Sequence, residues 1–504
     1  MLDRTVPVGV AGAGAMGAGI AQVAVTAGHP VRLYDVRAGA AGAAVEEVRG
    51  RLTRLVERGQ LDAAEAQAAA GRLASVGALD DLAECGLVIE AVVEDLEVKR
   101  ELFAALERVC APSAVLATNT SSLSVTALAA RLEHPQRVVG VHFFNPAPLL
   151  PLVEVVSGAA TDDAVASTVA ELVRGWGKTP VRCASTPGFI VNRVARPFYG
   201  EAMRLLEERV ADAATIDAVL REAGGFAMGP CELTDLIGQD VNHEVGRSVW
   251  EQTFHDARYQ PSLVQQRLVD AGWLGRKSGR GFYDYADSAR RPEPATEPPR
   301  PAPGRVTYHG GSPAIDALLA RAGAAGIPVE HTSFGWSAHE PVGLRLPGGG
   351  RLVECTGETA LARVSGADDA VAVLDWVGDP STATRVALAV SHPESGGLRD
   401  DAVGLLQAAG VAVSVVADAA GLIVARTVAM LANEAAEVVA RGEASPTDVD
   451  VAMQLGTSYP FGPYEWGVRH APEVVEVLDR LAMAHPSGRY RASPLLRRLA
   501  ADPR

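Results

Sequence analysis

A histidine and a glutamate twelve residues apart are the residue types of a general base and its partner. His142 ends an apolar run that begins at Val138, and imidazole is the side chain best suited to take a hydroxyl proton near neutral pH. Glu154 places a charge inside a second apolar run, 152–156, and a buried carboxylate needs a partner. A carboxylate that holds an imidazole fixes its tautomer. Either residue alone would more often be structural, but the pair predicts proton abstraction.

A glycine-rich turn supplies a second chemical signal near the N-terminus. The run Gly12-Ala-Gly-Ala-Met-Gly17 follows an apolar stretch and opens a helical one, the context in which such glycines bind a dinucleotide pyrophosphate. Asp35 ends the next apolar stretch, where an acid accepts ribose hydroxyls and repels a 2′-phosphate. NAD is therefore favoured, although the nearby Arg32 and Arg37 leave NADP open. The predicted cofactor contacts here are Gly12, Gly14, Ala15, Met16, Gly17 and Asp35.

Short apolar runs alternate with helical stretches over the first part of the chain, which predicts an α/β Rossmann fold with a doubly wound, mostly parallel sheet. His142 then lies at the carboxyl end of a strand, where such sheets bind ligands. Strand signals stop after residue 185, and 186–285 reads as all-α. The expected strands are 6–11, 31–35, 87–93, 114–118, 138–142 and 152–156.

The second half repeats this order of α/β and then helical sequence. A proline-rich stretch predicts an extended linker. Gly188–Arg193 aligns with Gly421–Arg426 at an offset of 233, and the same offset carries Glu201 onto Glu434, which indicates internal duplication. The predicted domains are 1–185 (NAD-binding), 186–285 (helical), 286–304 (linker), 305–418 (degenerate α/β) and 419–504 (second helical).

The second copy lacks the chemistry of the first. At the same offset His142 corresponds to Asp375, Glu154 to Ala387 and Asn192 to Ala425, and no comparable glycine motif precedes them. The second half is therefore predicted to be catalytically silent.

Composition excludes several other classes of function. The formal charge of −15 over 504 residues argues against a nucleic-acid partner. Five widely spaced cysteines without a C-x-x-C pair suggest neither a disulfide framework nor a metal site. No apolar run is long enough for a membrane span, and an early first strand leaves no room for a signal peptide. We expect a cytoplasmic protein that has no metal and no membrane partner.

Four stretches carry a resemblance to the 3-hydroxyacyl-CoA dehydrogenase family. These are Thr118–Ser124, Val141–Pro148, Thr186–Arg193 and Gly275–Tyr283. The likeness runs from residue 6 to 285 and resumes from 420 to about 500, and it is closest to long bacterial members that have a duplicated C-terminal domain. Such members are assigned to 3-hydroxybutyryl-CoA or 3-hydroxyadipyl-CoA oxidation.

The resemblance implies NAD-dependent oxidation of an (S)-3-hydroxyacyl-CoA to a 3-oxoacyl-CoA, in fatty-acid or phenylacetate catabolism. It also implies that helical domains pack against each other, and the duplication would supply that contact within one chain. We expect the protein to be a homodimer. The helical segment after Asp35, in which the family often supplies Ser and Lys near the coenzyme A moiety, departs from the family: it has Arg54 and Arg58, which could serve the phosphates. The implied roles are a base (His142), its orienting acid (Glu154), substrate-holding groups (Ser121, Asn192) and nicotinamide-side contacts (Glu94, Lys99, with Asn119 beside them).

Two other readings of the chain stay open. A β-hydroxyacid or sugar-acid dehydrogenase would carry a catalytic lysine in the helical domain, but 186–285 contains only Lys277. A non-enzymatic cofactor-binding scaffold would have lost the first-half catalytic residues, and all four are present. The acyl group is not predicted, although Arg196 could pair with a distal carboxylate.

Overall fold

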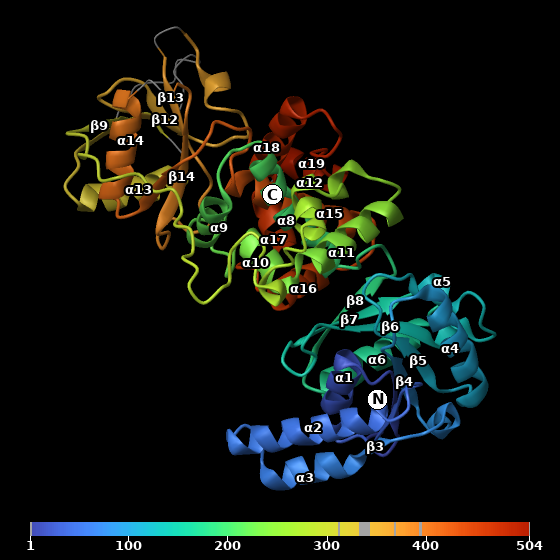
Figure 1. The fold of residues 1–504 in the computed structure, drawn as a ribbon. Coiled ribbons are helices and arrows are strands. Elements are labelled where there is room, and N and C mark those ends of the chain that lie inside the picture. The colour runs from blue at the N-terminus through green and yellow to red at the C-terminus, as the bar shows by residue number, and fades with distance from the viewer. Residues whose placement is uncertain (1–2, 311–312, 332–342, 367–368, 393–395, 503–504) are drawn as a thin grey trace. The chain divides into compact units, whose positions relative to one another are not determined.

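The computed structural model describes residues 3–310, 313–331, 343–366, 369–392 and 396–502 (Figure 1). The chain forms two compact units. The first unit contains residues 1–193 together with 441–457, and the second contains 194–440 together with 458–504. A short segment of the second helical repeat therefore belongs to the unit that holds the glycine-rich turn.

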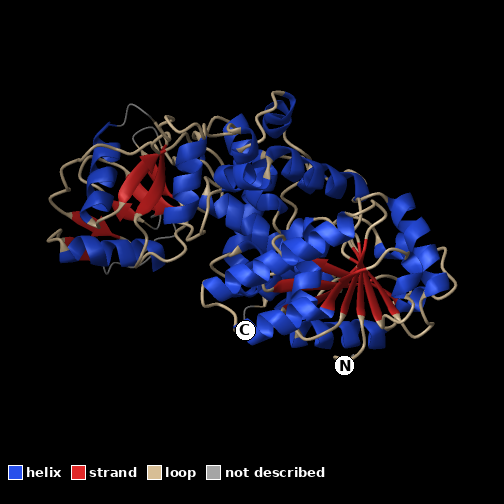
Figure 2. Ribbon diagram, turned by 60° about the horizontal axis from the view of Figure 1, so that its bottom comes forward, coloured by secondary structure: helices blue, strands red, loops and turns tan. Residues whose placement is uncertain are grey.

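An eight-stranded sheet organises the first unit, with the order β3-β2-β1-β4-β5-β6-β7-β8. Neighbouring strands are parallel except for β6 and β7, which are antiparallel. Figure 2 shows the strands of this sheet as a twisted fan with helices on both faces. The strands are β1 (Val8–Ala11), β2 (Val31–Tyr34), β3 (Leu73–Ser75), β4 (Leu87–Glu90), β5 (Val115–Thr118), β6 (Val138–Phe143), β7 (Leu152–Ser157) and β8 (Thr179–Ala184).

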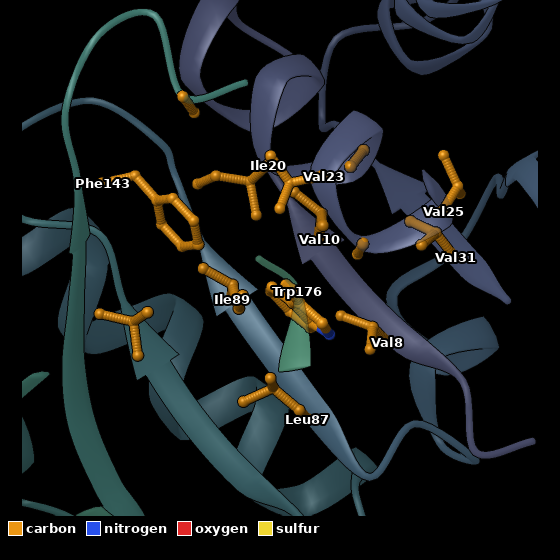
Figure 3. Packing of buried hydrophobic residues seen from close by; sticks show 14 of the residues in the cluster. Val8, Val10, Ile20, Val23, Val25, Val31, Leu87, Ile89, Phe143 and Trp176 are labelled. Carbon is orange, nitrogen blue, oxygen red and sulfur yellow. The ribbon is translucent and has the colours of Figure 1, made fainter. Parts of the chain in front are cut away.

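One face of this sheet is covered by a continuous apolar core. Val8 and Val10 of β1, Ile20 of the first helix and Ile89 of β4 lie in this core together with Trp176 (Figure 3). Their burial holds the first helix against the sheet and so fixes the glycine-rich turn that precedes it. The helices are α1 (Ala15–Thr26), α2 (Ala40–Glu57), α3 (Ala63–Arg72), α4 (Leu96–Val109), α5 (Val125–Ala129) and α6 (Asp163–Gly175).

All six expected strands are present, and the predicted fold class is confirmed. The expectation that one strand spans 87–93 is wrong at its end, because β4 stops at Glu90. There the Glu90 carboxylate accepts a hydrogen bond from the Val92 amide at 2.6 Å, which turns the chain out of the sheet. The strands β3 and β8 were not predicted, since one is very short and the other is interrupted by Pro180 and Arg182.

The region 186–285 is helical, as predicted. Its Gly275–Tyr283 motif folds around Asp235, whose carboxylate accepts hydrogen bonds from the amides of Phe282 and Tyr283, both at 3.0 Å. A Cβ atom on Gly281 would lie 1.9 Å from that carboxylate, so only glycine fits. This motif is therefore structural. The helices are α7 (Val191–Val194), α8 (Arg196–Glu207), α9 (Ala213–Glu222), α10 (Pro230–Ile237), α11 (Gln239–Gln252) and α12 (Leu263–Asp270).

The second α/β region contains a seven-stranded sheet with the order β10-β9-β11-β12-β13-β14-β15. Its β13-β14-β15 part repeats the antiparallel and then parallel pairing of β6-β7-β8. The elements are β9 (Val306–Tyr308), α13 (Pro313–Ala324), β10 (Val329–His331), β11 (Leu344–Arg345), β12 (Arg351–Glu354), β13 (Val371–Leu374), β14 (Arg385–Val390), α14 (Gly396–Ala408) and β15 (Ala412–Val415).

The proline-rich stretch is held against this second sheet. The Glu297 amide donates to the Val413 carbonyl at 2.8 Å, and the Gln407 side chain donates to the Glu297 carbonyl at 3.1 Å. The Ser414 hydroxyl donates to the Ala295 carbonyl at 2.6 Å. The middle of the stretch, 295–300, is therefore bonded to β15 and α14.

The two helical repeats pack against each other through matching buried ion clusters. Glu201 of α8 accepts hydrogen bonds from Arg489 at 2.5 Å and from Tyr490 at 2.8 Å. Its repeat partner Glu434, on the second copy of that helix, is bonded in the same way by Arg258 and Tyr259. Each copy thus binds the glutamate of the other, as expected for an internal pair. The helices of the second copy are α15 (Val424–Ala440), α16 (Pro446–Thr457), α17 (Pro463–Arg469), α18 (Ala471–Ala484) and α19 (Pro494–Ala501).

The α16 segment completes the first unit. It packs on β7 and β8, and a Cβ atom on Gly456 would lie 2.7 Å from Leu152. Just before this helix, the Glu443 carbonyl accepts a hydrogen bond from the Ala184 amide at 2.7 Å, which extends the edge of β8. The Glu443 carboxylate also forms an ion pair with the buried Arg193. The second half therefore covers part of the first sheet.

Candidate active site

The predicted base and its partner meet at the end of the sheet. His142 and Glu154 are directly opposite on the antiparallel strands β6 and β7, so their side chains emerge on the same face. The His142 Nδ1 atom lies 2.6 Å from the Glu154 Oε2 atom, and both residues are buried. The sequence predicted this pairing from residue type and spacing.

Glu154 is itself fixed by backbone donors. Its Oε1 atom accepts hydrogen bonds from the amides of Ile190 at 3.0 Å and Val191 at 2.9 Å, where α7 begins. The chain can aim these amides at the carboxylate because Gly188 and Phe189 both adopt positive φ, 77° and 48°. The Thr186–Arg193 motif thus anchors the dyad.

This arrangement favours one His142 tautomer. A carboxylate oxygen accepts hydrogen bonds, so the tautomer with the proton on Nδ1 satisfies the contact to Glu154. In that tautomer the Nε2 atom holds the lone pair and can accept a proton from a hydroxyl group. Chemically, an imidazole held in this way can act as an oriented general base.

The two predicted substrate-holding residues lie together. Asn192, on α7, donates its side-chain amide to the Ser121 carbonyl at 3.4 Å. The Ser121 loop follows β5 and is pinned by Glu94, whose carboxylate accepts hydrogen bonds from the Ser121 amide at 3.0 Å and the Thr120 hydroxyl at 2.6 Å. Glu94 therefore shapes the loop that carries Ser121.

A buried ion cluster beneath this loop was only partly predicted. The ammonium of Lys99 lies 2.7 Å from Glu90 and 3.0 Å from Glu94, and the Thr118 hydroxyl donates to Glu90 at 2.7 Å. Burial opposes ionisation of Glu94, but the Lys99 charge and the hydrogen bonds from Thr120 and Ser122 hold its pKa below the usual value. The Lys99 side chain is only 1% exposed, and its ammonium contacts the carboxylates of Glu90 and Glu94.

Sequence reasoning missed Glu90 in this cluster. The available signal was a charge at the end of the apolar run 87–90, the same signal that identified Glu154.

Asn119, which the sequence analysis placed beside the cofactor contacts, forms a hydrogen bond within the sheet region. Its side-chain oxygen accepts a hydrogen bond from the Phe143 amide at 2.9 Å and ties the end of β5 to the end of β6.

The glycine-rich turn has the shape that a pyrophosphate requires. Gly12 has φ of 115°, and a Cβ atom there would lie 2.3 Å from the Ala91 carbonyl oxygen. A Cβ atom on Gly17 would lie 1.8 Å from the Gly12 oxygen, so helix α1 can approach the turn only with glycine there. A Cβ atom on Gly14 would meet nothing within 4 Å, which leaves open space before the α1 N-terminus. Ala15 and Met16 begin that helix, and its first amides face this space.

Asp35 stands beside the turn as predicted for a ribose-binding acid. Its Oδ2 atom accepts a hydrogen bond from the Ala13 amide at 2.8 Å. Hydrogen bonds from the exposed Arg37 side chain lower the pKa of Asp35 to about 2, so the acceptor is ionised near neutral pH. Arg32 forms an ion pair with Glu84, which offsets its charge. These residues fit NAD.

The second copy keeps the backbone arrangement that surrounds the His142–Glu154 pair but has neither of the two side chains. Asp375 stands at the position that corresponds to His142, and its carboxylate accepts hydrogen bonds from the amides of Ile423, Val424 and Ala425 at 2.9, 2.7 and 3.0 Å. Two of these amides correspond to the pair that Glu154 binds in the first copy. One aspartate thus replaces the histidine and the glutamate as a helix anchor.

Family models match nearly the whole chain. Residues 7–186 match the NAD binding domain of 3-hydroxyacyl-CoA dehydrogenase, and 188–285 and 421–504 both match its C-terminal domain. This chain belongs to the 3-hydroxyacyl-CoA dehydrogenase family. It is an NAD-dependent 3-hydroxyacyl-CoA dehydrogenase. Residues 352–419 match the reduced Rossmann-fold domain of 3-hydroxybutyryl-CoA dehydrogenase, which agrees with the degenerate second sheet.

Similar proteins include both long and short members of this family. The chain is 44% identical over 501 residues to 3-hydroxyadipyl-CoA dehydrogenase of Escherichia coli K12, covering 99% of this chain and 98% of the relative. It is 42% identical over 278 residues to a probable 3-hydroxybutyryl-CoA dehydrogenase of Bacillus subtilis, which covers 55% of this chain and 96% of that protein.

A crystal structure of 3-hydroxybutyryl-CoA dehydrogenase from Escherichia coli K12 has the same fold as this dehydrogenase. It superposes with a TM-score of 0.88 at 43% identity and covers 99% of both chains. The duplicated arrangement is therefore shared with a solved relative. The names of these relatives differ in the acyl group that they oxidise.

Proposed function

We propose that His142 is the catalytic base of this dehydrogenase and that Glu154 orients it. The observation that carries the proposal is the 2.6 Å contact between these side chains, with Glu154 fixed by two backbone amides. The reaction needs a group that takes the hydroxyl proton as the carbonyl forms. The Nε2 atom of His142 is such a group.

In the proposed reaction the 3-hydroxyl loses its proton to His142 and the C3–H bond gives up a hydride. Bound NAD supplies the hydride acceptor. The developing carbonyl dipole needs hydrogen-bond donors, and Ser121 and Asn192, which lie together, are the donors that we propose. The cofactor contacts proposed for this reaction are Gly12, Gly14, Ala15, Met16, Gly17, Asp35, Glu94, Lys99 and Asn119.

The proposed substrate is (S)-3-hydroxyadipyl-CoA, which would place the enzyme in phenylacetate breakdown. The support is the Escherichia coli relative of that name, which is similar along almost the entire chain. 3-Hydroxybutyryl-CoA is the second candidate, supported by the structural relative.

The two substrates are distinguished by comparing kcat/KM with purified enzyme and NAD. A value at least about tenfold higher for 3-hydroxyadipyl-CoA corresponds to about 1.4 kcal/mol of differential transition-state binding and supports the dicarboxylate. The reverse ratio supports 3-hydroxybutyryl-CoA. Oxidation of neither substrate, with full cofactor binding, would argue for another acyl chain.

We further propose that the repeat divides the chain at 185, 285, 304 and 418, and that the second half serves packing. The reciprocal clusters of Glu201 and Glu434 support this role.

Among the residues that the structure describes, no helix is long and apolar enough to cross a membrane. We propose a homodimer in the cytoplasm, and light scattering coupled to gel filtration tests the oligomeric state.

A further inference from the structure

A cavity of about 240 Å³ lies in the second copy, beside the residue that corresponds to the catalytic histidine. Trp376, which follows Asp375 at the end of β13, lines it together with Val424 at the start of α15. These two positions correspond to Phe143 and Val191 in the first copy. The duplicated fold has therefore kept a hollow next to its former catalytic position.

The walls of this cavity are aromatic. The Trp466 ring on α17 lies 5.6 Å from Trp376, 5.5 Å from Phe461 and 4.6 Å from His470, measured between ring centroids. The first copy has Leu233 and Ile237 at the positions of Trp466 and His470. Aromatic faces have thus replaced aliphatic side chains here.

The charges around the cavity are negative. Glu354 and Glu473 line it, and none of the described lining residues is Lys or Arg. Burial lowers the pKa of His470, Glu473 opposes this effect and the Arg469 charge adds to it, so the ring is neutral near pH 7. The nearby guanidinium of Arg321 donates to the carbonyls of Pro380 and Ala383 at 2.9 and 3.0 Å. Aromatic faces and carboxylates together attract cations.

The size and chemistry of the cavity exclude the substrate of the first copy. An apolar cavity of roughly 150 Å³ accommodates a benzene molecule, so 240 Å³ suits one substituted ring and is far too small for coenzyme A. The Asp375 carboxylate accepts hydrogen bonds from Trp376, Ile423, Val424 and Ala425, so it is fully occupied as a backbone anchor. A ligand here would bind without being converted.

We propose that this cavity is a non-catalytic binding site for a small organic cation, an ammonium group attached to a single aromatic ring. The ring would pack among Trp376, Phe461 and Trp466, and the ammonium would face Glu354 and Glu473. The site is separate from the dehydrogenase reaction, so it stands whether or not the proposed acyl substrate is correct.

The test is calorimetric titration of the full-length enzyme with benzyltrimethylammonium, compared with benzyl alcohol and phenylacetate. We expect the cation to bind most tightly and phenylacetate least. Trp466→Leu, which installs the first-copy residue, should weaken the cation about tenfold, as expected for loss of an aromatic face. Trp376→Phe, the other first-copy residue, gives a second and milder variant.

Charge recognition is tested with a matched pair on α18. Glu473→Gln should weaken benzyltrimethylammonium about threefold or more, whereas the exposed Glu476→Gln on the same helix should not. Dehydrogenase activity of each variant reports that the chain has folded. Equal binding of phenylacetate and the cation, unchanged affinity in both tryptophan variants, or no saturable binding would overturn the proposal.

Discussion

His142 and Glu154 form one hydrogen-bonded unit, and in the proposed mechanism the carboxylate acts through the ring that it holds. Glu154 is 0% exposed and bonds two amides as well as His142. A buried carboxylate with fewer partners would be costly. Chemistry and local stability therefore depend on the same three contacts.

Replacing His142 by alanine should lower kcat at least about 10²-fold, the usual contribution of a general base. NAD binding, measured by fluorescence titration, should remain nearly unchanged because the glycine-rich turn is untouched. A variant that keeps more than about a tenth of the wild-type kcat would show that His142 is not the base. Glu154→Gln is the matched test, since a side-chain amide facing Nδ1 favours the wrong tautomer and should also lower kcat.

Asp35→Ala should raise the KM for NAD and relax discrimination against NADP. The acceptor for the ribose hydroxyls and the repulsion of a 2′-phosphate disappear together, and Arg37, now without its carboxylate partner, becomes available to a phosphate. Steady-state kinetics with both cofactors measure the ratio. Equal use of NAD and NADP by the unaltered enzyme would contradict the assignment.

Because the pKa of Asp35 is about 2, this carboxylate loses its proton well below pH 5. Its folded pKa is depressed, so its stabilising contacts are present above the ordinary value near 3.8 and are lost as the pH falls toward 2. We expect the cofactor preference to be constant between pH 6 and 9. A change of preference within that range in the unaltered enzyme would require another titrating group.

The α16 segment is the element that most clearly couples the two halves of the sequence. It packs on β7, which carries Glu154, and on β8. The ion pair between Glu443 and Arg193 lies next to Asn192, so it also supports α7, whose first amide binds Glu154. The second repeat thus stabilises the elements that position the dyad.

Glu443→Ala should lower the free energy of unfolding by about 3 kcal/mol, since removing one partner of a buried ion pair is strongly destabilising. The Arg193 side chain is only 2% exposed, so solvent screens this pair little. Thermal denaturation measures the effect, and the exposed Glu476→Ala serves as the control. A melting temperature equal to that of the control would show that the pair does not support this unit.

At the scale of the whole molecule, the duplication places two helical repeats in one chain, and the interface between them buries ion pairs. Arg426 binds both Glu201 and Glu208 across the helical repeats, and the Arg426 side chain is 0% exposed. Such charges need their partners to remain folded. We therefore expect the second half to contribute to stability, although it lacks the residues proposed to be catalytic.

A chain truncated to residues 1–300 should aggregate or change its oligomeric state and lose activity. The truncation removes α15 and the partners of Glu201, and it strips α16 from the first sheet, so apolar surface becomes exposed. Light scattering and kcat/KM measure the outcome. A soluble fragment with the full-length oligomeric state and undiminished kcat/KM would refute the packing role.

The sequence by itself determined the features that depend on local pattern. The glycine turn, Asp35 and the strand that ends in His142 are read from neighbouring residues, because backbone freedom and strand alternation act over a few positions. The duplication was equally visible, since aligned residues such as Glu201 and Glu434 need no structure to be compared.

Only the tertiary structure decided which distant groups share a contact. Three contacts join residues from separate elements: the Glu90–Lys99 pair, the Arg193–Glu443 pair, and the hydrogen bonds from the start of α15 to Asp375. A charge within an apolar run indicates that a partner is needed. Which residue becomes the partner depends on packing between segments that are far apart in the sequence. The residue types therefore indicated the chemistry, and the fold selected the partners that make it possible.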